Sequence, residues 1–241
     1  MKAISFKDWE SIALRQGSKV SIRKPLLAPA SAIFLNIEND FFRFNTGRNQ
    51  VCAEKMAYQL GDTLYVKETW RVGAAHRFEA DARIEFKSGG PNTIIQFPGR
   101  KSQSCWRDDL DAFIQKWEVG SGHWNSPVLM PMEAARLFLR VTGIRIQHLQ
   151  DITDEECADE GICAWTKDGK LYKYFPADRE GDYPACPWNE CPRTPKEAMQ
   201  RVWDESIRFK ESRKFFGWDA NPWVEVVKFE QISKEEALKD A

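Results

Sequence analysis

The order of strand-like and helix-like patterns along this chain is the feature that most restricts its fold. Short strand patterns are separated by long excursions, and the regular alternation of strands and helices that builds βαβ units is missing. A parallel, doubly wound sheet is therefore disfavoured, because each of its strands needs a helical crossover to the next. We predict an α+β fold with a small, mixed but mostly antiparallel β-barrel and flanking helices.

The strongest strand pattern covers residues 63–70, which are rich in branched and aromatic side chains. A short strand at residues 3–6 leads into apolar residues at helical spacing, and Gly17 follows where a helix C-terminus favours glycine. Further expected elements are a short extended or turn segment at 19–24, a hairpin of 83–86 with 93–97, a helix at 107–117, and strands at 137–146 and 223–232.

The second half of the chain carries clear helix starts. Thr153 and Glu156 form a capping box for a short acidic helix, and Pro195 occupies the first position of another helix. Residues 163–193 are rich in turn-forming residues and are expected to be a loop, whereas residues 30–58 show too little pattern for an assignment.

Length and composition indicate an ordinary globular protein. The 241 residues can bury a sizeable core, and we expect a single domain with insertions at about 71–123 and 163–193. Hydrophobic residues make up 42% and charged residues 29%, which excludes wholesale disorder. No apolar run is long enough to cross a membrane, and the first residues lack a signal-peptide pattern. We expect a cytoplasmic protein that does not bind membranes.

The six cysteines are spread along the chain. Without an export signal we expect reduced thiols rather than a disulfide framework. Zinc held by Cys157, Cys163, Cys186 and Cys191 is an alternative, but the last two are loosely spaced for ligands and no histidine lies between them. We therefore expect no metal and no cofactor. With only three histidines and no H-E-x-x-H or G-x-S-x-G motif, a histidine-dependent hydrolase is disfavoured.

Three cations follow Gly17 within a short stretch of sequence. Gly17 would let the backbone approach a ligand closely, and Lys19, Arg23 and Lys24 would meet phosphate. The alternative is a helix cap followed by a solvated basic turn.

Two other places carry candidate ligand contacts. Glu68 and Trp70 share one face of a strand, so the carboxylate could accept from an exocyclic amine while the indole stacks on a base. The alternative for Glu68 is an exposed edge-strand position. The helix dipole explains the acids that begin the acidic helix, but not Glu160 at its other end, which we single out as functional.

Motifs at five places in the chain follow one another in an order that fits a known family. They are Ile4-Ser5-Phe6 with Gly17-x-Lys19 and Arg23-Lys24, Gly61-Asp62-x-Leu64-Tyr65-Val66-Lys67-Glu68-Thr69-Trp70, Trp124-x-Ser126-Pro127-x-x-Met130-Pro131-x-x-Ala134-x-Arg136, Leu149-Gln150-Asp151-Ile152-Thr153 through Glu160-Gly161-Ile162, and Trp218-Asp219-Ala220-Asn221-Pro222-Trp223-Val224. Together they resemble ASCH-domain proteins of the PUA-like superfamily, in the phage and prophage branch often labelled morphogenetic proteins. The resemblance covers roughly residues 2–25, 59–70, 124–162 and 195–232.

This resemblance implies a PUA-like barrel with a cleft for RNA or a modified nucleoside. Small bacterial members of the family hydrolyse the acetamide of N4-acetylcytidine with a lysine, a threonine and a glutamate. By position the lysine falls on Lys19 and the glutamate on Glu160. The threonine position is Ile22, which has no nucleophilic atom, and Ser21 is the nearest hydroxyl.

We therefore predict that the protein binds RNA or a modified nucleoside. Two alternatives remain open, namely an amidohydrolase acting on N4-acylated cytidine and a phage assembly or host-interaction protein. We expect Lys19, Glu68, Trp70 and Glu160 to converge on one concave site. The candidate catalytic residues are Lys19, Glu160 and Ser21, and the candidate ligand-binding residues are Gly17, Arg23, Lys24, Glu68, Trp70 and Arg136.

Overall fold

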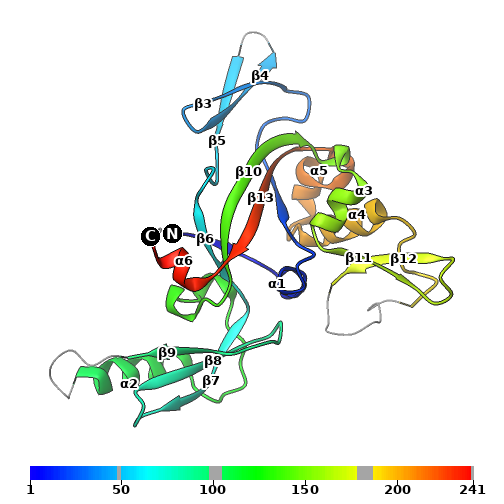
Figure 1. Ribbon diagram of the computed structural model, residues 1–241. Helices are drawn as coiled ribbons and strands as arrows, with labels where there is room; N and C mark the ends of the chain where they lie inside the picture. The colour runs from blue at the N-terminus through cyan, green and yellow to red at the C-terminus, as the bar shows by residue number, and fades with distance from the viewer. Residues whose placement is uncertain (48–49, 98–104, 178–186, 240–241) are drawn as a thin grey trace. The chain divides into compact units, whose positions relative to one another are not determined.

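The computed structural model describes residues 1–47, 50–97, 105–177 and 187–239 of the chain. It is a mixed α+β structure in which most strand pairs are antiparallel (Figure 1). The chain divides into two compact units. Unit 1 comprises Met1–Ile12, Thr63–Leu139 and Ile232–Ala241, and unit 2 comprises Ala13–Asp62 and Arg140–Gln231.

Unit 1 contains an antiparallel meander in which β8 lies between β7 and β9. In addition, β1 runs parallel to β6, which lies next to the beginning of β10. The expected hairpin of 83–86 with 93–97 and the expected helix at 107–117 are both confirmed. The elements are β1 (Lys2–Ser5), the start of α1 (Asp8–Arg15), β6 (Thr63–Lys67), β7 (Trp70–His76), β8 (Asp81–Phe86), β9 (Thr93–Gln96), α2 (Cys105–Trp117), η1 (Pro127–Leu129), η2 (Met132–Ala134), the start of β10 (Phe138–His148) and α6 (Lys234–Lys239).

Unit 2 contains β13 between β10 and β2, with β13 and β2 antiparallel. It also holds the three-stranded sheet β3–β4–β5 and the hairpin β11–β12. The elements are the end of α1, β2 (Ser21–Pro25), β3 (Ile33–Glu38), β4 (Phe41–Gly47), β5 (Gln50–Lys55), most of β10, η3 (Leu149–Asp151), α3 (Asp154–Asp159), β11 (Ile162–Thr166), β12 (Tyr172–Pro176), α4 (Pro195–Ser206), η4 (Lys210–Ser212), α5 (Arg213–Phe216), η5 (Trp218–Ala220) and β13 (Trp223–Ile232).

Each unit has its own apolar core because strand residues alternate between two faces. In unit 1 the inward positions of β7 and β8 pack with α2 around Trp70. In unit 2 one core gathers on α3 and α4 around Trp203. A second forms where Phe42 and Phe44 of β4 pack with Trp223. The buried faces of these strands thus bring residues that are far apart in the sequence into contact within each core.

The sheet at residues 33–55 was missed by sequence reasoning. Its first hairpin turns at Asn39 and Asp40, whose φ angles are 48° and 66°. Two successive residues with positive φ form a type I′ turn, whose twist matches that of the two strands it connects. Asn and Asp tolerate this conformation. A register shift between Phe34 and Asn36 marks a bulge in β3, which obscures the alternation that would have revealed the strand.

The expected loop at 163–193 is wrong over its first part, because residues 162–176 form the hairpin β11–β12. Asp168 stabilises the connecting turn by accepting hydrogen bonds from the backbone N–H groups of Lys170 and Leu171, each at 2.9 Å. Part of the same expected loop, 178–186, lies outside the described residues.

The expected closed barrel is not seen. Among the described residues the strands fall into separate open sheets, because β3–β5 and β7–β9 pair as meanders of their own. The expected insertion at 71–123 supplies β7, β8, β9 and α2 of unit 1. Within the described ranges, no helix combines the length and apolar character needed to span a bilayer.

Candidate functional site

Gly17 ends helix α1 as a glycine cap. Its N–H donates to Leu14 O at 3.0 Å, the N–H of Ser18 donates to Ala13 O at 3.0 Å, and its φ is 75°. These two bonds form the Schellman motif, in which a left-handed glycine satisfies the last carbonyls of a helix. Gly17 is therefore a structural cap, and the expectation that it contacts a ligand is not supported. The cap turns the chain towards Lys19, which begins the next extended segment.

Strand β2 presents two different faces. Ser21 and Arg23 are buried on one face, while Ile22 and Lys24 alternate with them on the other. Lys19 lies on the same side as Ser21 and Arg23, because all three contact one carboxylate. The position that the family resemblance assigns to threonine, Ile22, therefore points away from this carboxylate, and Ser21 points towards it.

The carboxylate of Glu160 accepts hydrogen bonds from three side chains. Lys19 Nζ donates to Oε2 at 3.0 Å and to the Glu160 backbone oxygen at 3.1 Å. Arg23 Nη1 donates to Oε1 at 2.6 Å, and Ser21 Oγ donates to the same oxygen at 3.2 Å. The structure thus brings together Lys19 and Glu160, which are 141 positions apart in the sequence.

Glu156, one helical turn before Glu160 on α3, extends this group towards the surface. Its Oε2 accepts from Arg23 Nη2 at 2.7 Å, and its Oε1 pairs with Arg145. Exposure of the side chains rises from 3% at Glu160 through 18% at Glu156 to 41% at Arg145. We call Lys19, Ser21, Arg23, Glu156 and Glu160 the Glu160 cluster, and Arg145 with Gln147 its partly exposed rim.

The pKa values of Glu156 and of its neighbour Cys157 are shifted in opposite directions. Burial raises the pKa of Glu156, but Arg23, Arg145 and hydrogen bonds from Thr153 and Gln147 together lower it by more, so it lies below its ordinary value. Burial raises the pKa of Cys157, which lies beside Glu156 on α3, to about 12. Cys157 is therefore a protonated thiol at neutral pH and is not a nucleophile for this site.

The opposite face of β2 holds a second polar group. Lys24 Nζ donates to Tyr58 Oη at 2.8 Å, and Lys24 lies across from the buried Glu225 of β13. Burial lowers the pKa of Lys24 although Glu225 opposes this, and burial raises the pKa of Tyr58 to about 12. Lys24 is thus engaged within unit 2 and is not the free phosphate-binding cation that the sequence suggested.

Glu68 and Arg136, both expected to bind a ligand, bind each other in unit 1. Arg136 donates through Nε and Nη2 to the two oxygens of Glu68 at 2.8 and 2.7 Å, and Ser88 Oγ donates to Glu68 at 2.8 Å. Arg136 also donates to Pro91 O at 2.6 Å and lies over the ring of Phe86. This forked pair fixes the turn after β8 and leaves Glu68 fully bonded within the protein.

Trp70 is part of the unit 1 core rather than a stacking surface. Its side chain has no exposed area and packs edge-on against Trp117, with ring centroids 4.8 Å apart. An indole buried in this way cannot stack on a base. Lys19 and Glu160 belong to unit 2 and contact each other, whereas Glu68 and Trp70 belong to unit 1.

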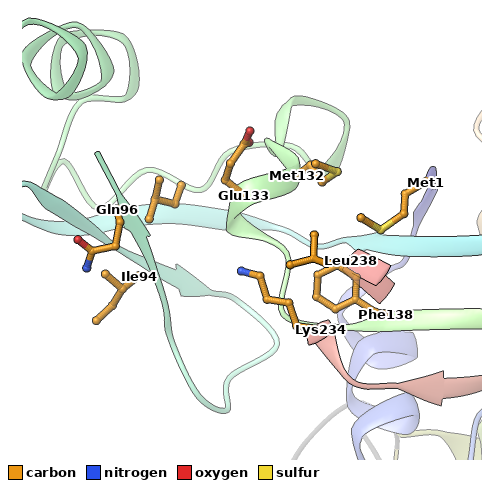
Figure 2. A pocket seen from close by; sticks show the side chains of 9 residues that line it. Met1, Ile94, Gln96, Met132, Glu133, Phe138, Lys234 and Leu238 are labelled. Carbon is orange, nitrogen blue, oxygen red and sulfur yellow. The ribbon is translucent and has the colours of Figure 1, made fainter. Parts of the chain in front are cut away.

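Unit 1 contains a pocket of about 290 Å³ that the sequence did not indicate. Figure 2 shows Lys234, Leu238 and Phe138 on one side of it, with Ile94 and Gln96 opposite them. Its walls are mainly apolar, and none of the expected site residues line it.

The cysteines only partly follow expectation. Cys52, Cys157 and Cys163 are free thiols, but Cys191 is disulfide-bonded, so the prediction that all are reduced is wrong. Sequence spacing alone does not distinguish reduced from oxidised cysteines in one loop. In the part of the chain that the structure describes, no group of three or more His, Cys, Asp or Glu side chains is arranged to hold a metal ion.

Sequence reasoning missed the outer members of the cluster. Glu156 was assigned only to the capping box, which it does form with Thr153, and Arg145 was not singled out. A signal was present, because Arg145 and Gln147 alternate along β10 with Ile144 and Ile146, which pack against a core. Such alternation places the polar pair on the face opposite that core.

Comparison of the chain with protein-family models, with curated proteins and with solved structures found no match in any of the three.

Removal of the Glu160 charge should strongly destabilise the fold. Glu160→Gln leaves Lys19 and Arg23 buried without their shared carboxylate, so we expect the free energy of unfolding to fall by about 3–5 kcal/mol. Urea denaturation followed by tryptophan fluorescence measures this. The control is Glu205→Gln in the exposed Arg201–Glu205 pair, which should cost less than about 1 kcal/mol. Equal losses in the two variants would contradict the buried cluster.

Acid should remove the contribution of Glu156 to stability. Its pKa is lowered in the folded protein, so this contribution is complete above the unfolded value near 4.5 and is lost as the pH falls through the folded value. Thermal unfolding from pH 6 to pH 2 should therefore show a weaker pH dependence for Glu156→Gln than for the unchanged protein. The control is Glu211→Gln, since Glu211 is exposed. If Glu156→Gln shows the same pH dependence of the unfolding temperature as the unchanged protein, Glu156 does not contribute in this way.

Proposed function

We propose that this protein is an ASCH-type member of the PUA-like superfamily and that unit 2 binds a modified nucleoside or nucleobase at the Glu160 cluster. One observation carries the proposal. Lys19 and Glu160, which the family resemblance pairs as site residues, share an ion pair with a 3.0 Å separation although they lie in distant parts of the chain.

The chemistry of the cluster suits the edge of a base. A carboxylate accepts hydrogen bonds from an exocyclic amine, while an ammonium, a guanidinium and a hydroxyl donate to carbonyl or amide oxygens. Glu160 supplies the first kind of group, and Lys19, Arg23 and Ser21 supply the second. These groups bond to one another in the structure, so a ligand would take over some of their mutual hydrogen bonds. Arg23 Nε is buried and has no hydrogen-bond partner within the described residues, so one donor stays available for a ligand.

Stability alone does not account for such a cluster. Two cations and a carboxylate lie almost fully buried, which costs desolvation energy. Apolar side chains of similar volume often stabilise a protein as well or better. A binding role explains why polar groups occupy this place in unit 2.

The burial pattern favours a base over a nucleic-acid backbone as the ligand. Lys19 and Arg23 have fully buried side chains paired with carboxylates, and Lys24 is bonded to Tyr58. For single strands, three free phosphate contacts would give a slope of roughly −2 in log K against log salt concentration. We expect a slope near zero for ligand binding at this site instead. We propose that a ligand reaches the cluster through the rim, because Arg145 is 41% exposed there.

Binding of nucleosides should depend on the rim. We expect titration calorimetry with a panel of acylated and methylated nucleosides to find a ligand whose affinity falls at least about 5-fold in Arg145→Ala, the size of one lost charge-assisted hydrogen bond. Arg201→Ala is the matched control, because Arg201 is also a partly exposed arginine paired with a glutamate. If no member of the panel binds, or if both variants lose affinity equally, the site is misplaced.

The position of Ser21 favours a second candidate function, hydrolysis of an N-acyl group. Its hydroxyl lies 3.2 Å from Glu160 Oε1, so a nucleophile and a base are in contact. Lys19 contacts Glu160 rather than Ser21, so the base within reach of the hydroxyl is Glu160.

The reaction needs only these groups and one water molecule. Ser21 Oγ bonds to the acyl carbon while its proton passes to Glu160, and Lys19 and Arg23 donate to the developing oxyanion. The carbon–nitrogen bond then breaks, and Glu160 returns the proton to the leaving amine. Water, activated in the same way, cleaves the serine ester and releases the carboxylic acid.

Activity on N4-acetylcytidine is expected to be weak, well below about one turnover per second. Where turnover is measurable by chromatographic detection of cytidine, Ser21→Ala should abolish it, since the nucleophile is removed. Ile22→Thr should leave it unchanged, because Ile22 lies on the other face of β2. Full activity of Ser21→Ala would assign the attack to water and exclude the serine.

A further inference from the structure

A short basic and aromatic segment of unit 2, residues 208–216, is not explained by the Glu160 cluster. Phe209 and Phe215 expose 62% and 61% of their surface, although large aromatic side chains are usually buried. Four cations stand among them, with Glu211 as the one acid. We call this segment the 208–216 strip, and its cations are Arg208, Lys210, Arg213 and Lys214.

The cations of the strip are available for a ligand. All four are exposed, and within the described residues none of their side chains takes part in an ion pair or hydrogen bond. Two of them lie close to aromatic rings: the Arg208 guanidinium is 5.5 Å from the Phe209 ring centroid, and Lys214 Nζ is 4.9 Å from that of Phe215. Ring and positive charge are thus presented side by side.

The backbone of the strip is held firmly to helix α4, beside which α5 lies (Figure 1). Trp203 Nε1 donates to Phe216 O at 2.6 Å, and the N–H of Trp218 donates to Asp204 Oδ1 at 2.9 Å. Gly217 ends α5, and a Cβ on it would lie 2.4 Å from Arg213 O, so only glycine fits. A surface fixed before binding loses less entropy when a ligand arrives.

From this geometry we infer that the 208–216 strip binds single-stranded nucleic acid. The cations contact phosphates, and Phe209 and Phe215 stack on bases, which is how single strands are bound without sequence readout. An anionic membrane is the competing partner for basic and aromatic residues. It is disfavoured because membrane affinity scales with the apolar area that an amphipathic helix buries, and α5 has only four residues.

This inference goes beyond the proposed nucleoside site and does not rest on it. The probe is a fluorescently labelled oligouridylate of about 12 nucleotides, within the range of single-strand site sizes, which contains no modified base. Fluorescence anisotropy with the full-length protein should show binding that weakens with salt. Four phosphate contacts predict a slope of about −3 in log K against log salt.

Substitutions in the strip should weaken this binding in two distinct ways. Phe209→Ala and Phe215→Ala should each lower affinity about 5-fold or more without changing the salt slope. Lys210→Ala and Lys214→Ala should each reduce the magnitude of the slope by about 0.7. Matched controls in unit 1 are Phe78→Ala, whose side chain is fully exposed, and the exposed Lys234→Ala, and both should bind like the unchanged protein.

Three results would overturn the inference. These are no anisotropy change at low salt, equal losses in the strip and control variants, and binding to phosphatidylserine vesicles without binding to the oligonucleotide. Arg145→Ala separates the two sites, since it should weaken nucleoside binding and leave oligouridylate binding unchanged. Since all substituted side chains of the strip are exposed, these variants should fold, which circular dichroism checks.

Discussion

The carboxylate of Glu160 joins strand β2 and helix α3 through charge, and the candidate site depends on it. Three donors from one face of the segment 19–23 converge on its two oxygens. Within the described residues, Glu156 is the other acid of the cluster, and of the three donors it contacts only Arg23. Lys19, Ser21 and Arg23 are therefore held together by a single side chain, that of the residue at the C-cap of α3.

Strand β2 is unusual in carrying polar groups on both of its faces. One face meets Glu160, and the other places Lys24 near Tyr58 and Glu225. Neighbouring β13 is mostly apolar along the same stretch. A buried strand of this kind is held in register by specific charge pairs as well as by backbone bonds, since a shift by one residue would exchange its faces.

How much the sequence could predict differs between backbone and site. Strong local signals were sufficient for the capping box at Thr153 and for the strand at residues 223–232, which the structure confirms. Glu160 was identifiable because an acid at a helix C-terminus conflicts with the dipole, and such a conflict indicates another partner. Contacts between distant segments carried no such signal. Nothing local to Glu68 and Arg136 reveals that they satisfy each other rather than a ligand.

The open edges of the sheet β3–β4–β5 bear on how this protein behaves at high concentration. β3 and β5 are its outer strands, and Ile33 and Val51 on them are more than half exposed. An exposed apolar edge is a template for pairing with another chain. The bulge after Phe34 interrupts the flat run of backbone donors and acceptors on β3, which hinders such pairing. We expect self-association through this sheet to be limited by the kink in β3 rather than by the net charge of −1.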